Sequence, residues 1–369
     1  MKQRVIFPLV FVVLISSPLV GELLGGAGRL ETNSNPEKLY FSVDIEYPKA
    51  VSEWVGSNAA LTDYARSVDD LLWSSLEKKP DDYELSDRVL TTSSGKLFIV
   101  DQFQEQCSPH ASVDEIGRTL DEFLGELNSN GVRTFVAISP NKSTLNWDSI
   151  PTSYPLYQCA ISFNQEFWDA VLDVDGVIDL VQPLVAFESD FGISSFKNRD
   201  THWNQGGATT AVTAILDEID EEGVLPNLDL YLERIIDYQG DLDGLNGASP
   251  VIDQTVSFSI RNTPLVESTT EVVEENAYDG NRRISNTSDK PLLGKIVVFG
   301  DSFTEVAEQF LAPFFDEVTY YRLYDFNVDT YAELMSDADY VLFWSVERSF
   351  VWRLTNQWVY LPPVALEAS

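Results

Sequence analysis

Basic residues are scarce in this chain, which has 24 Lys and Arg against 59 Asp and Glu and a formal net charge of -35 over 369 residues. Contacts with phosphate groups need Lys and Arg, so this balance argues against binding to nucleic acid, whether DNA or RNA. The acidic residues run along the whole chain, including the stretch from Asp44 to Glu367. That spread favours a surface adapted to high salt over a patch that attracts one cationic partner. At about 1 M salt, charges are screened within roughly 3 Å, so we expect the melting temperature to fall when salt is removed.

Histidine and cysteine are also rare. The two histidines are His110 and His202, and the two cysteines are Cys107 and Cys159. Their spacing matches no zinc site, and glycine-rich nucleotide-binding loops are missing, so we expect no metal and no cofactor. The cysteines form one disulfide if the protein is exported, or else they remain two buried thiols.

Long apolar runs are missing except at the start of the chain. A short basic segment precedes an uncharged run over residues 5–21 that Pro8 and Pro18 interrupt. This run is short for a membrane span, which needs about 20 apolar residues. We predict a signal peptide over residues 1–28, with an N-terminal membrane anchor as the alternative because no clear cleavage site stands out. The protein is then exported, either extracellular or anchored on the outer face of the cytoplasmic membrane.

Hydrophobic residues make up 44% of the chain, enough for a sizeable core. Residues 29–40 are polar, and we predict a linker over residues 29–49, followed by one domain over residues 50–369. Helical spacing of apolar residues predicts helices over residues 50–77, 112–128, 206–216, 305–311 and 331–335. Short apolar runs predict strands over residues 96–100, 134–138, 177–181, 295–299, 317–323 and 340–344.

Alternating strands and helices determine the expected fold class. The strand–helix–strand unit over residues 96–138 favours a parallel sheet that is covered by helices. Residues 240–290 are rich in Gly, Asn, Asp and Ser and are predicted to be loops with one short strand pair around residues 251–260. We therefore expect an α/β fold, a three-layer α/β/α domain with a mainly parallel sheet and irregular insertions.

The first motif with chemical meaning is Gly300-Asp301-Ser302, which follows an apolar strand and precedes a helix. Ligands of open α/β sheets collect at the carboxyl ends of the strands. A serine at this position has backbone N–H groups nearby that can stabilise the oxyanion of an acyl-transfer intermediate. The alternative interpretation is that Ser302 only caps the helix.

The second motif is Asp200-Thr201-His202-Trp203. A serine nucleophile usually needs a neighbouring base, most often histidine. His202 has Asp200 two residues earlier, where a carboxylate can orient the imidazole, whereas His110 has no adjacent motif. Alone, the motif also fits a surface histidine in a polar loop. Together with the Gly300-Asp301-Ser302 turn, it favours a catalytic set of Ser302, His202 and Asp200.

The order of the two motifs resembles that of the alginate O-acetyltransferase group of SGNH-hydrolase-like proteins, which acetylate exported polysaccharides. In that group a D-x-H-W motif precedes a G-[DT]-S motif, the reverse of ordinary SGNH esterases. The resemblance covers roughly residues 90–350. Shorter segments that are also similar to the group are Gly95–Phe98, Pro140–Thr144, Gly240–Leu242 and Val346–Arg348.

The resemblance implies an SGNH-hydrolase-like catalytic domain that moves an acetyl group through an acyl-serine to hydroxyls of a polysaccharide or surface glycan. It also implies a membrane-bound acyltransferase partner that supplies the acyl group. Gly300, Asp301, Lys142 and Trp203 become candidates for substrate binding. Trp203 either stacks on a sugar ring or packs in the core, and Lys142 either lies near the site or is a surface lysine.

The chain departs from the group in two respects. We expect no separate carbohydrate-binding module after residue 350, and the strong negative charge suits an anionic polysaccharide poorly. Two further hypotheses therefore stay open. A secreted carbohydrate esterase would use the same three residues, with water instead of a sugar as the second nucleophile. A non-catalytic glycan-binding or assembly protein would keep only the fold, although the intact set of Asp200, His202 and Ser302 argues against it.

Overall fold

The computed structural model describes residues 83–129, 131–220, 223–247, 249–274, 281–324 and 326–361. The predicted signal peptide or anchor over residues 1–28, the linker over residues 29–49 and the helix over residues 50–77 lie outside these ranges. Within the described ranges, no helix combines the length and the apolar composition that crossing a membrane requires.

The described residues contain a central sheet of seven strands in the order β5-β4-β12-β10-β11-β9-β8. These strands are β4 (Thr134–Ser139), β5 (Val177–Ile178), β8 (Glu267–Glu274), β9 (Asn281–Thr287), β10 (Leu293–Gly300), β11 (Phe315–Arg322) and β12 (Tyr340–Val346). The strands from β5 to β11 run parallel, and β9 and β8 continue the sheet in antiparallel pairing. The prediction of a mainly parallel sheet is confirmed.

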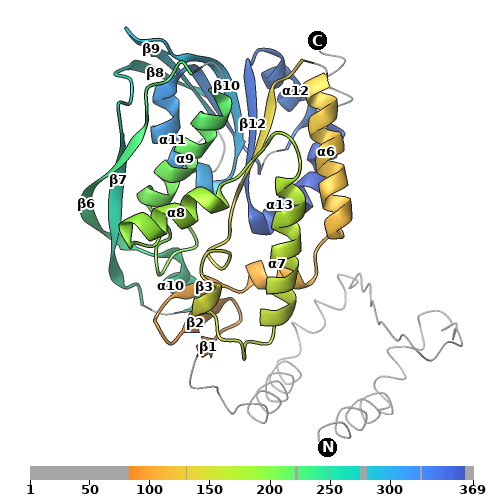
Figure 1. Ribbon diagram of the computed structural model, residues 1–369, viewed down its shortest axis with the longest axis vertical. Helices are drawn as coiled ribbons and strands as arrows, with labels where there is room; N and C mark the ends of the chain where they lie inside the picture. The colour runs from red at the N-terminus through yellow and green to blue at the C-terminus, as the bar shows by residue number, and fades with distance from the viewer. Residues whose placement is uncertain are drawn as a thin grey trace, which may run out of the picture. The chain divides into compact units, whose positions relative to one another are not determined.

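Helices cover both faces of this sheet (Figure 1). One face carries α8 (Val181–Phe191), α9 (Gln205–Ile219) and α11 (Ser302–Leu311), and the other carries α6 (Val113–Ser129), α7 (Tyr157–Leu172), α12 (Val328–Ser336) and α13 (Glu347–Asn356). Along β10, Ile296 and Val298 belong to the first core, whereas Val297 and Phe299 belong to the second. This alternation buries both faces, as expected for a strand inside a layered α/β domain. The three-layer α/β/α architecture is confirmed.

Most predicted elements of these layers are found within a few residues of their expected bounds. The exception among them is the strand over residues 177–181, which ends at Ile178. Asp179 accepts hydrogen bonds from the backbone N–H groups of Val181 and Gln182, at 2.7 and 3.1 Å, and so starts α8 there. An aspartate just before a helix can accept hydrogen bonds from the N–H groups that the first helical turn leaves free. Because the helix starts here, the strand ends before its predicted bound.

The strand predicted over residues 96–100 exists, but it lies in a different sheet. It forms β3 (Leu97–Ile99), which pairs antiparallel with β2 (Val89–Thr92) and, through it, β1 (Tyr83–Leu85). The predicted strand–helix–strand unit with β4 is therefore wrong. The apolar residues of β3 are buried because Leu97 and Phe98 pack in separate small cores, away from the central sheet.

The prediction of loops with one short strand pair over residues 240–290 is wrong in part, because the strand expected around residues 251–260 is found as β7 but further strands are present. β6 (Asp229–Gln239) and β7 (Ile252–Arg261) form a long antiparallel ribbon, and β8 and β9 extend the central sheet. The ribbon packs inward through Phe258, whose ring lies 5.0 Å from that of Phe187 in α8. Most residues of β6 are exposed or only partly buried, and the high content of Gly, Asn, Asp and Ser over residues 240–290 alone indicates loops rather than strands.

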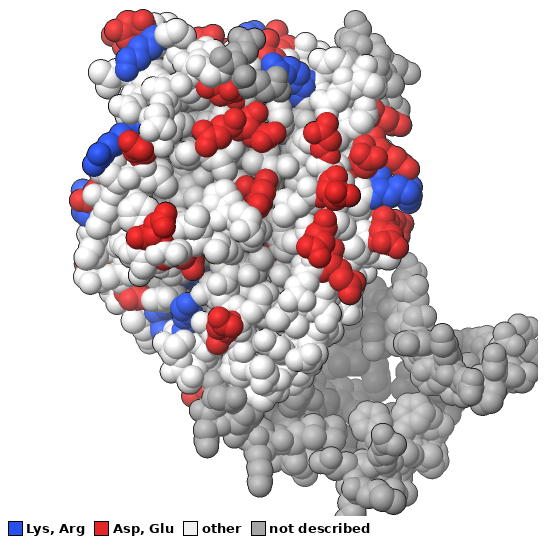
Figure 2. All heavy atoms as spheres, viewed as in Figure 1, with Lys and Arg blue, Asp and Glu red and all other residues white. Residues whose placement is uncertain are grey.

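Acidic side chains are spread over the surface of the domain. Figure 2 shows Asp and Glu scattered over the whole visible face, with few Lys and Arg among them. No single acidic patch stands out on this face. The distribution fits a charge that is a property of the surface as a whole.

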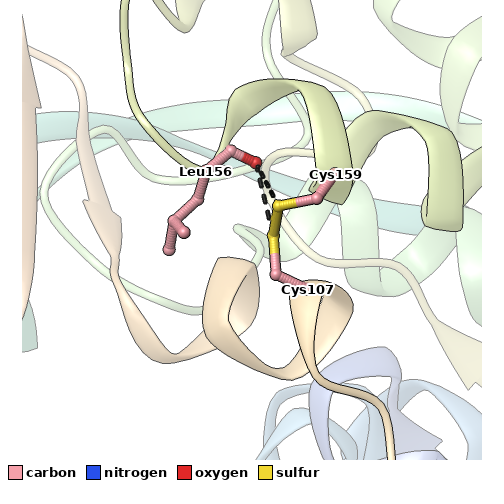
Figure 3. Close-up of a disulfide and its surroundings, with 3 residues drawn as sticks. All are labelled: Cys107, Leu156 and Cys159. Atoms are coloured by element: carbon pink, nitrogen blue, oxygen red, sulfur yellow. Dashed lines mark hydrogen bonds between the residues drawn. A yellow bond between two sulfur atoms is a disulfide. The ribbon is translucent and has the colours of Figure 1, made fainter. Parts of the chain in front are cut away.

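A disulfide joins Cys107, the last residue of α5 (Asp101–Cys107), to Cys159 in α7 (Figure 3). The two Cα atoms are 5.2 Å apart, and both sulfur atoms lie within 3.4 Å of the carbonyl oxygen of Leu156. The bridge connects residues 52 positions apart. By restricting the unfolded chain, such a bridge typically contributes about 2–4 kcal/mol to the free energy of unfolding.

Candidate active site

The turn between β10 and α11 positions Ser302 at the carboxyl edge of the central sheet. Ser302 is the first residue of α11, and the residue that caps this helix is Asp301, whose carboxylate accepts a hydrogen bond of 3.0 Å from the backbone N–H of Phe303. The interpretation of Ser302 as a mere helix cap is therefore wrong. Its hydroxyl is left available for another partner.

Gly300 and Asp301 are both buried and hold this turn in place. A Cβ atom at Gly300 would overlap the side chain of Thr304, so the turn requires glycine. The Asp301 carboxylate also accepts a hydrogen bond of 2.7 Å from the backbone N–H of Val346, at the end of the neighbouring strand β12. Asp301 is 2% exposed, so its predicted role in substrate binding is corrected to a role in supporting the turn.

The partner of Ser302 is His202, which lies 100 residues earlier in the chain. The Nε2 atom of His202 is 2.8 Å from Ser302 Oγ, and its Nδ1 atom is 2.8 Å from Asp200 Oδ1. The same carboxylate oxygen accepts a hydrogen bond of 2.9 Å from the backbone N–H of His202. The structure thus brings together the three residues that the two motifs singled out, in a continuous hydrogen-bonded chain.

Asp200 is buried, and its surroundings favour the ionised carboxylate. Burial acts to raise its pKa, but the side-chain hydrogen bond with His202, the charge of Lys197 and the backbone hydrogen bond outweigh this effect. The net result is a pKa well below the ordinary range. Lys197 Nζ lies 3.4 Å from the second carboxylate oxygen. Asp200 can therefore hold the Nδ1–H of a neutral imidazole while Nε2 faces the serine.

A second carboxylate supports the same loop, from α10 (Asp241–Leu245). Asp241 accepts hydrogen bonds from the backbone N–H and the hydroxyl of Thr201, at 2.8 and 2.5 Å, and its Oδ2 atom is 3.5 Å from His202 Nδ1. A Cβ atom at Gly240 would overlap the backbone of Arg199, so this close approach also requires glycine. Asp241 was not among the predicted site residues, and the only signal for it in the sequence was the short similar segment Gly240–Leu242.

Among the described residues, Asp200, His202 and Asp241 form a group that could offer a metal ion three ligand atoms within 4.8 Å of one another. However, Nδ1 of His202 already faces Asp200 and Nε2 already faces Ser302, both at hydrogen-bond distance. The arrangement is explained by a proton-transfer chain without a cation.

Comparison with known proteins agrees with this geometry. The sequence profile of the family described as "SGNH hydrolase-like domain, acetyltransferase AlgX" matches residues 89–321, well over half of the chain. The chain belongs to this family. Comparison with curated protein sequences finds no match.

Several solved structures are similar to this AlgX-family domain at low sequence identity. A DHHW family protein from Eubacterium siraeum is 13% identical, with a TM-score of 0.50 over 76% of this chain and 97% of that one. PatB1 from Bacillus cereus, solved with a sulfonyl adduct, is 13% identical, with a TM-score of 0.48 over 75% and 98%. The O-acetyltransferase domain of AlgJ from Pseudomonas putida is 16% identical, with a TM-score of 0.43 over 73% and 99%.

Trp203 lies in the core of the AlgX-family domain. It is 0% exposed, its Nε1–H donates a hydrogen bond of 3.1 Å to the backbone oxygen of Phe303, and its ring lies 5.2 Å from the Phe303 ring. Of the two predicted roles, core packing is the one that this position allows, and stacking on a sugar is not. Trp203 links the histidine loop directly to the first turn of α11.

Lys142 is neither a surface lysine nor a residue that faces the Ser302 hydroxyl. Its side chain is 4% exposed, and Nζ donates hydrogen bonds to the backbone oxygens of Leu97 and Asn198, at 2.8 and 3.1 Å. Burial lowers the pKa of Lys142 to about 7. Its predicted role in substrate binding is corrected to contact with the protein's own backbone, beside the loop that carries Asp200.

The other histidine lies away from this site. His110 is largely exposed and lies 3.4 Å from Glu105. It contacts none of Asp200, His202 or Ser302 among the interactions of the described residues, so the choice of His202 as the candidate base agrees with the geometry.

Arg348, in the first turn of α13, stood out in the sequence only as part of a similar segment. Its guanidinium lies 5.4 Å from the centre of the Phe303 ring, next to Ser302 in the chain. Burial lowers the pKa of Arg348, while the charges of Asp301 and Asp241 oppose this effect. The guanidinium has no hydrogen bond or ion pair with any of the described residues, so its donors are free to meet a negatively charged oxygen.

Proposed function

We propose that the protein is an O-acetyltransferase that carries an acetyl group on Ser302 and passes it to a hydroxyl of an exported polysaccharide or surface glycan. The observation that carries this proposal is the chain of hydrogen bonds from Asp200 through His202 to Ser302 Oγ. Membership of the acetyltransferase AlgX family supports the acetyl group as the cargo.

In the first half of the reaction, Ser302 Oγ attacks the carbonyl carbon of the acyl donor while its proton moves to His202 Nε2. Asp200 holds Nδ1–H and stabilises the imidazolium that forms. The tetrahedral intermediate then collapses, the bond to the donor breaks, and the leaving group takes the proton from Nε2. Acetyl-Ser302 and a neutral His202 remain.

In the second half, the acceptor hydroxyl gives its proton to His202 Nε2 as its oxygen attacks the carbonyl carbon of acetyl-Ser302. Collapse of the second intermediate breaks the bond to Ser302 Oγ, which takes back the proton. Water in place of the sugar would make the protein an esterase by the same steps. The distinction therefore depends on whether a glycan displaces water from the acyl-serine.

Both intermediates carry a negative oxygen that needs hydrogen-bond donors. The backbone N–H of Ser302, the first residue of α11, has no acceptor inside the helix, whereas the N–H groups of Phe303 and Thr304 already bond to Asp301. Arg348 adds a positive charge on the neighbouring helix α13, beside Phe303. These groups supply the oxyanion stabilisation that acyl transfer requires.

The cellular setting follows from the same proposal. A disulfide between Cys107 and Cys159 suits an oxidising compartment and thus export. An acyl donor does not occur freely outside the cytoplasm, so a membrane-bound acyltransferase is the partner that would deliver it. The dispersed acidic surface suits work in high salt, where screening removes the self-repulsion of the net charge.

Intact mass spectrometry tests the proposal in high salt, after brief exposure to an activated acetyl ester. Wild type, Ser302→Ala and the control Ser336→Ala, which removes an exposed hydroxyl, would be compared with and without an oligosaccharide. The expected result is an acetyl adduct on wild type and Ser336→Ala only, discharged faster by the oligosaccharide, which gains the acetyl group. Discharge to acetate at the same rate with or without sugar would indicate an esterase. Normal turnover by Ser302→Ala would refute the mechanism.

A further inference from the structure

Lys142 connects segments that are far apart in the chain. It lies three residues after the end of β4, and its two hydrogen bonds reach Leu97 in β3 and Asn198. Asn198 comes two residues before Asp200, so a movement of Asn198 carries the candidate catalytic loop with it. One buried ammonium thus joins the loop after β4, the small β1–β3 sheet and the loop that ends at Asp200 and His202.

An ammonium at this position is not what packing alone would select. Its hydrogen-bond partners are neutral carbonyl oxygens, whereas a buried cation is normally paired with a carboxylate. The oxygen of Asn198 already accepts a hydrogen bond of 2.9 Å from the backbone N–H of Leu97, so β3 and the loop would remain tied without the lysine. A feature that costs stability beside a reactive site indicates a functional role.

The charged groups around Lys142 also indicate a functional role. The negative charges of Asp200 and Asp241 act to raise the pKa of Lys142. The positive charges of Lys96 and Lys197 act to lower it. The two carboxylates are the ones that hold the backbone and side chains of Thr201 and His202. Lys142 therefore supplies a buried positive charge beside the loop that these carboxylates support.

We propose that Lys142 is a positioning residue for acyl transfer, whose ammonium holds Asn198 and attracts the carboxylates of Asp200 and Asp241, so that His202 stays within hydrogen-bond reach of Ser302. This inference rests on the proposed function. Lys142 acts through the Asp200–His202 loop and touches neither the acyl group nor the acceptor.

The test is Lys142→Met, which keeps the length of the side chain and removes its charge and donors. We expect kcat for acetyl transfer to fall roughly 10- to 100-fold, since small displacements of a catalytic group have effects of this size, with KM changed less than about twofold. At pH 7 the melting temperature should equal or exceed that of wild type, because a buried charge has been removed. A merely structural lysine would lower activity and melting temperature together.

The matched control is Lys96→Met. Lys96 is a neighbouring lysine in the same cluster, and its ammonium bonds to the side chain of Asn146 rather than to the Asp200 loop. The Lys96→Met variant loses the same charge as Lys142→Met but keeps the contacts to the Asp200 loop. We therefore expect its kcat to stay within about twofold of wild type. If Lys142→Met does not fold, Lys142→Gln serves as the second variant, and failure of both to fold would overturn the inference in favour of a structural role.

The pH dependence adds an independent readout. The pKa of Lys142 is lowered to about 7 in the folded protein, so wild type should lose kcat as the pH rises above that value, and Lys142→Met should lack this loss. Between about pH 7 and the ordinary value of 10.5, the unfolded chain binds the extra proton, so wild-type stability rises with pH. The advantage in melting temperature of Lys142→Met should therefore shrink across this range.

Wild-type kcat in Lys142→Met, or an equal loss in Lys96→Met, would overturn the inference. Failure of the proposed function looks different, because Ser302→Ala would then turn over normally. If Ser302→Ala is inactive and Lys142→Met is fully active, only the positioning role is refuted.

Discussion

Two carboxylates lie buried near the carboxyl edge of the central sheet, and their partners differ. Asp200 faces the imidazole of His202 and the ammonium of Lys197. Glu347, the first residue of α13, meets only neutral donors. These are the side-chain amides of Gln106 and Asn164, both at 2.7 Å, the backbone N–H of Asn141 at 2.9 Å and the hydroxyl of Thr144 at 2.6 Å.

This difference in partners changes the protonation of the two groups in opposite directions. Burial raises the pKa of Glu347, and the hydrogen bonds from Thr144, Asn141, Gln106 and Asn164 only partly offset it. The pKa of Asp200 is lowered despite its burial, because His202 and Lys197 favour the charge. A buried carboxylate that faces cationic or titrating groups can thus serve proton transfer, whereas one surrounded by neutral donors joins α5, α7 and the loop after β4 into a rigid support.

The largest expected difference is in activity. Asp200→Asn should lower acetyl transfer by about 10³- to 10⁴-fold, because an amide no longer selects the imidazole tautomer that faces Ser302. Glu347→Gln should change it by less than roughly tenfold, since it does not face the reacting groups. Steady-state transfer to an oligosaccharide from an activated acetyl ester measures both. Equal losses in the two variants would erase the distinction between a reactive and a supporting carboxylate.

For stability, substitution of Glu347 should have a larger effect than substitution of Asp200. Glu347→Ala leaves four donors without their common acceptor and should lower the free energy of unfolding by about 3 kcal/mol. Asp200→Ala should lower it by less, because fewer donors depend on this carboxylate. Urea unfolding in high salt gives both values, with Glu347→Gln as the conservative control. A Glu347→Ala protein as stable as wild type would contradict the supporting role.

The contributions of the two carboxylates to stability should change in opposite directions as the pH falls. The stability that Asp200 contributes is present above the ordinary pKa of 3.8 and is lost as the pH falls further. The contribution of protonated Glu347 is present below its ordinary pKa of 4.5 and is lost as the pH rises through the raised value. From neutral pH down to about 4.5, the wild type gains this contribution, so the stability deficit of Glu347→Gln should grow. The deficit of Asp200→Asn should instead shrink below about pH 4, and the same trend in both variants would contradict this assignment.

The smallest expected effect belongs to Lys197, the ionic partner that Glu347 lacks. Its Nζ atom lies 3.4 Å from Asp200 in a partly exposed pair, a type of contact worth about 0.2–1 kcal/mol. Lys197→Met should therefore lower kcat only about two- to fivefold, with less effect at high salt than at low salt. A loss as large as that of Asp200→Asn would show that Lys197 does more than support the carboxylate.

The site was predictable from the sequence to the extent that its residues stand in short motifs. With two histidines in the chain, only His202 had a carboxylate at a spacing that suits an orienting role, and Ser302 directly followed an apolar strand. The supporting residues stood only in short segments of weaker similarity, and the role predicted for Lys142 was not the one that the structure shows. Asp241, Lys142 and Arg348 are ordinary charged residues in a strongly charged chain, and nothing local distinguishes a buried one from an exposed one.

The layered α/β class could be predicted from the sequence alone, and the motifs around His202 and Ser302 indicated the chemistry that we propose, because apolar periodicity and the neighbours of a rare histidine are local properties. The tertiary structure was needed to show that Asp301 and not Ser302 caps α11, that Trp203 is in the core, and that β3 lies outside the central sheet. It also shows that residues 267–274 and 281–287 form strands of the central sheet. These outcomes depend on hydrogen bonds and packing between segments far apart in the chain, where burial and pairing energies override local composition.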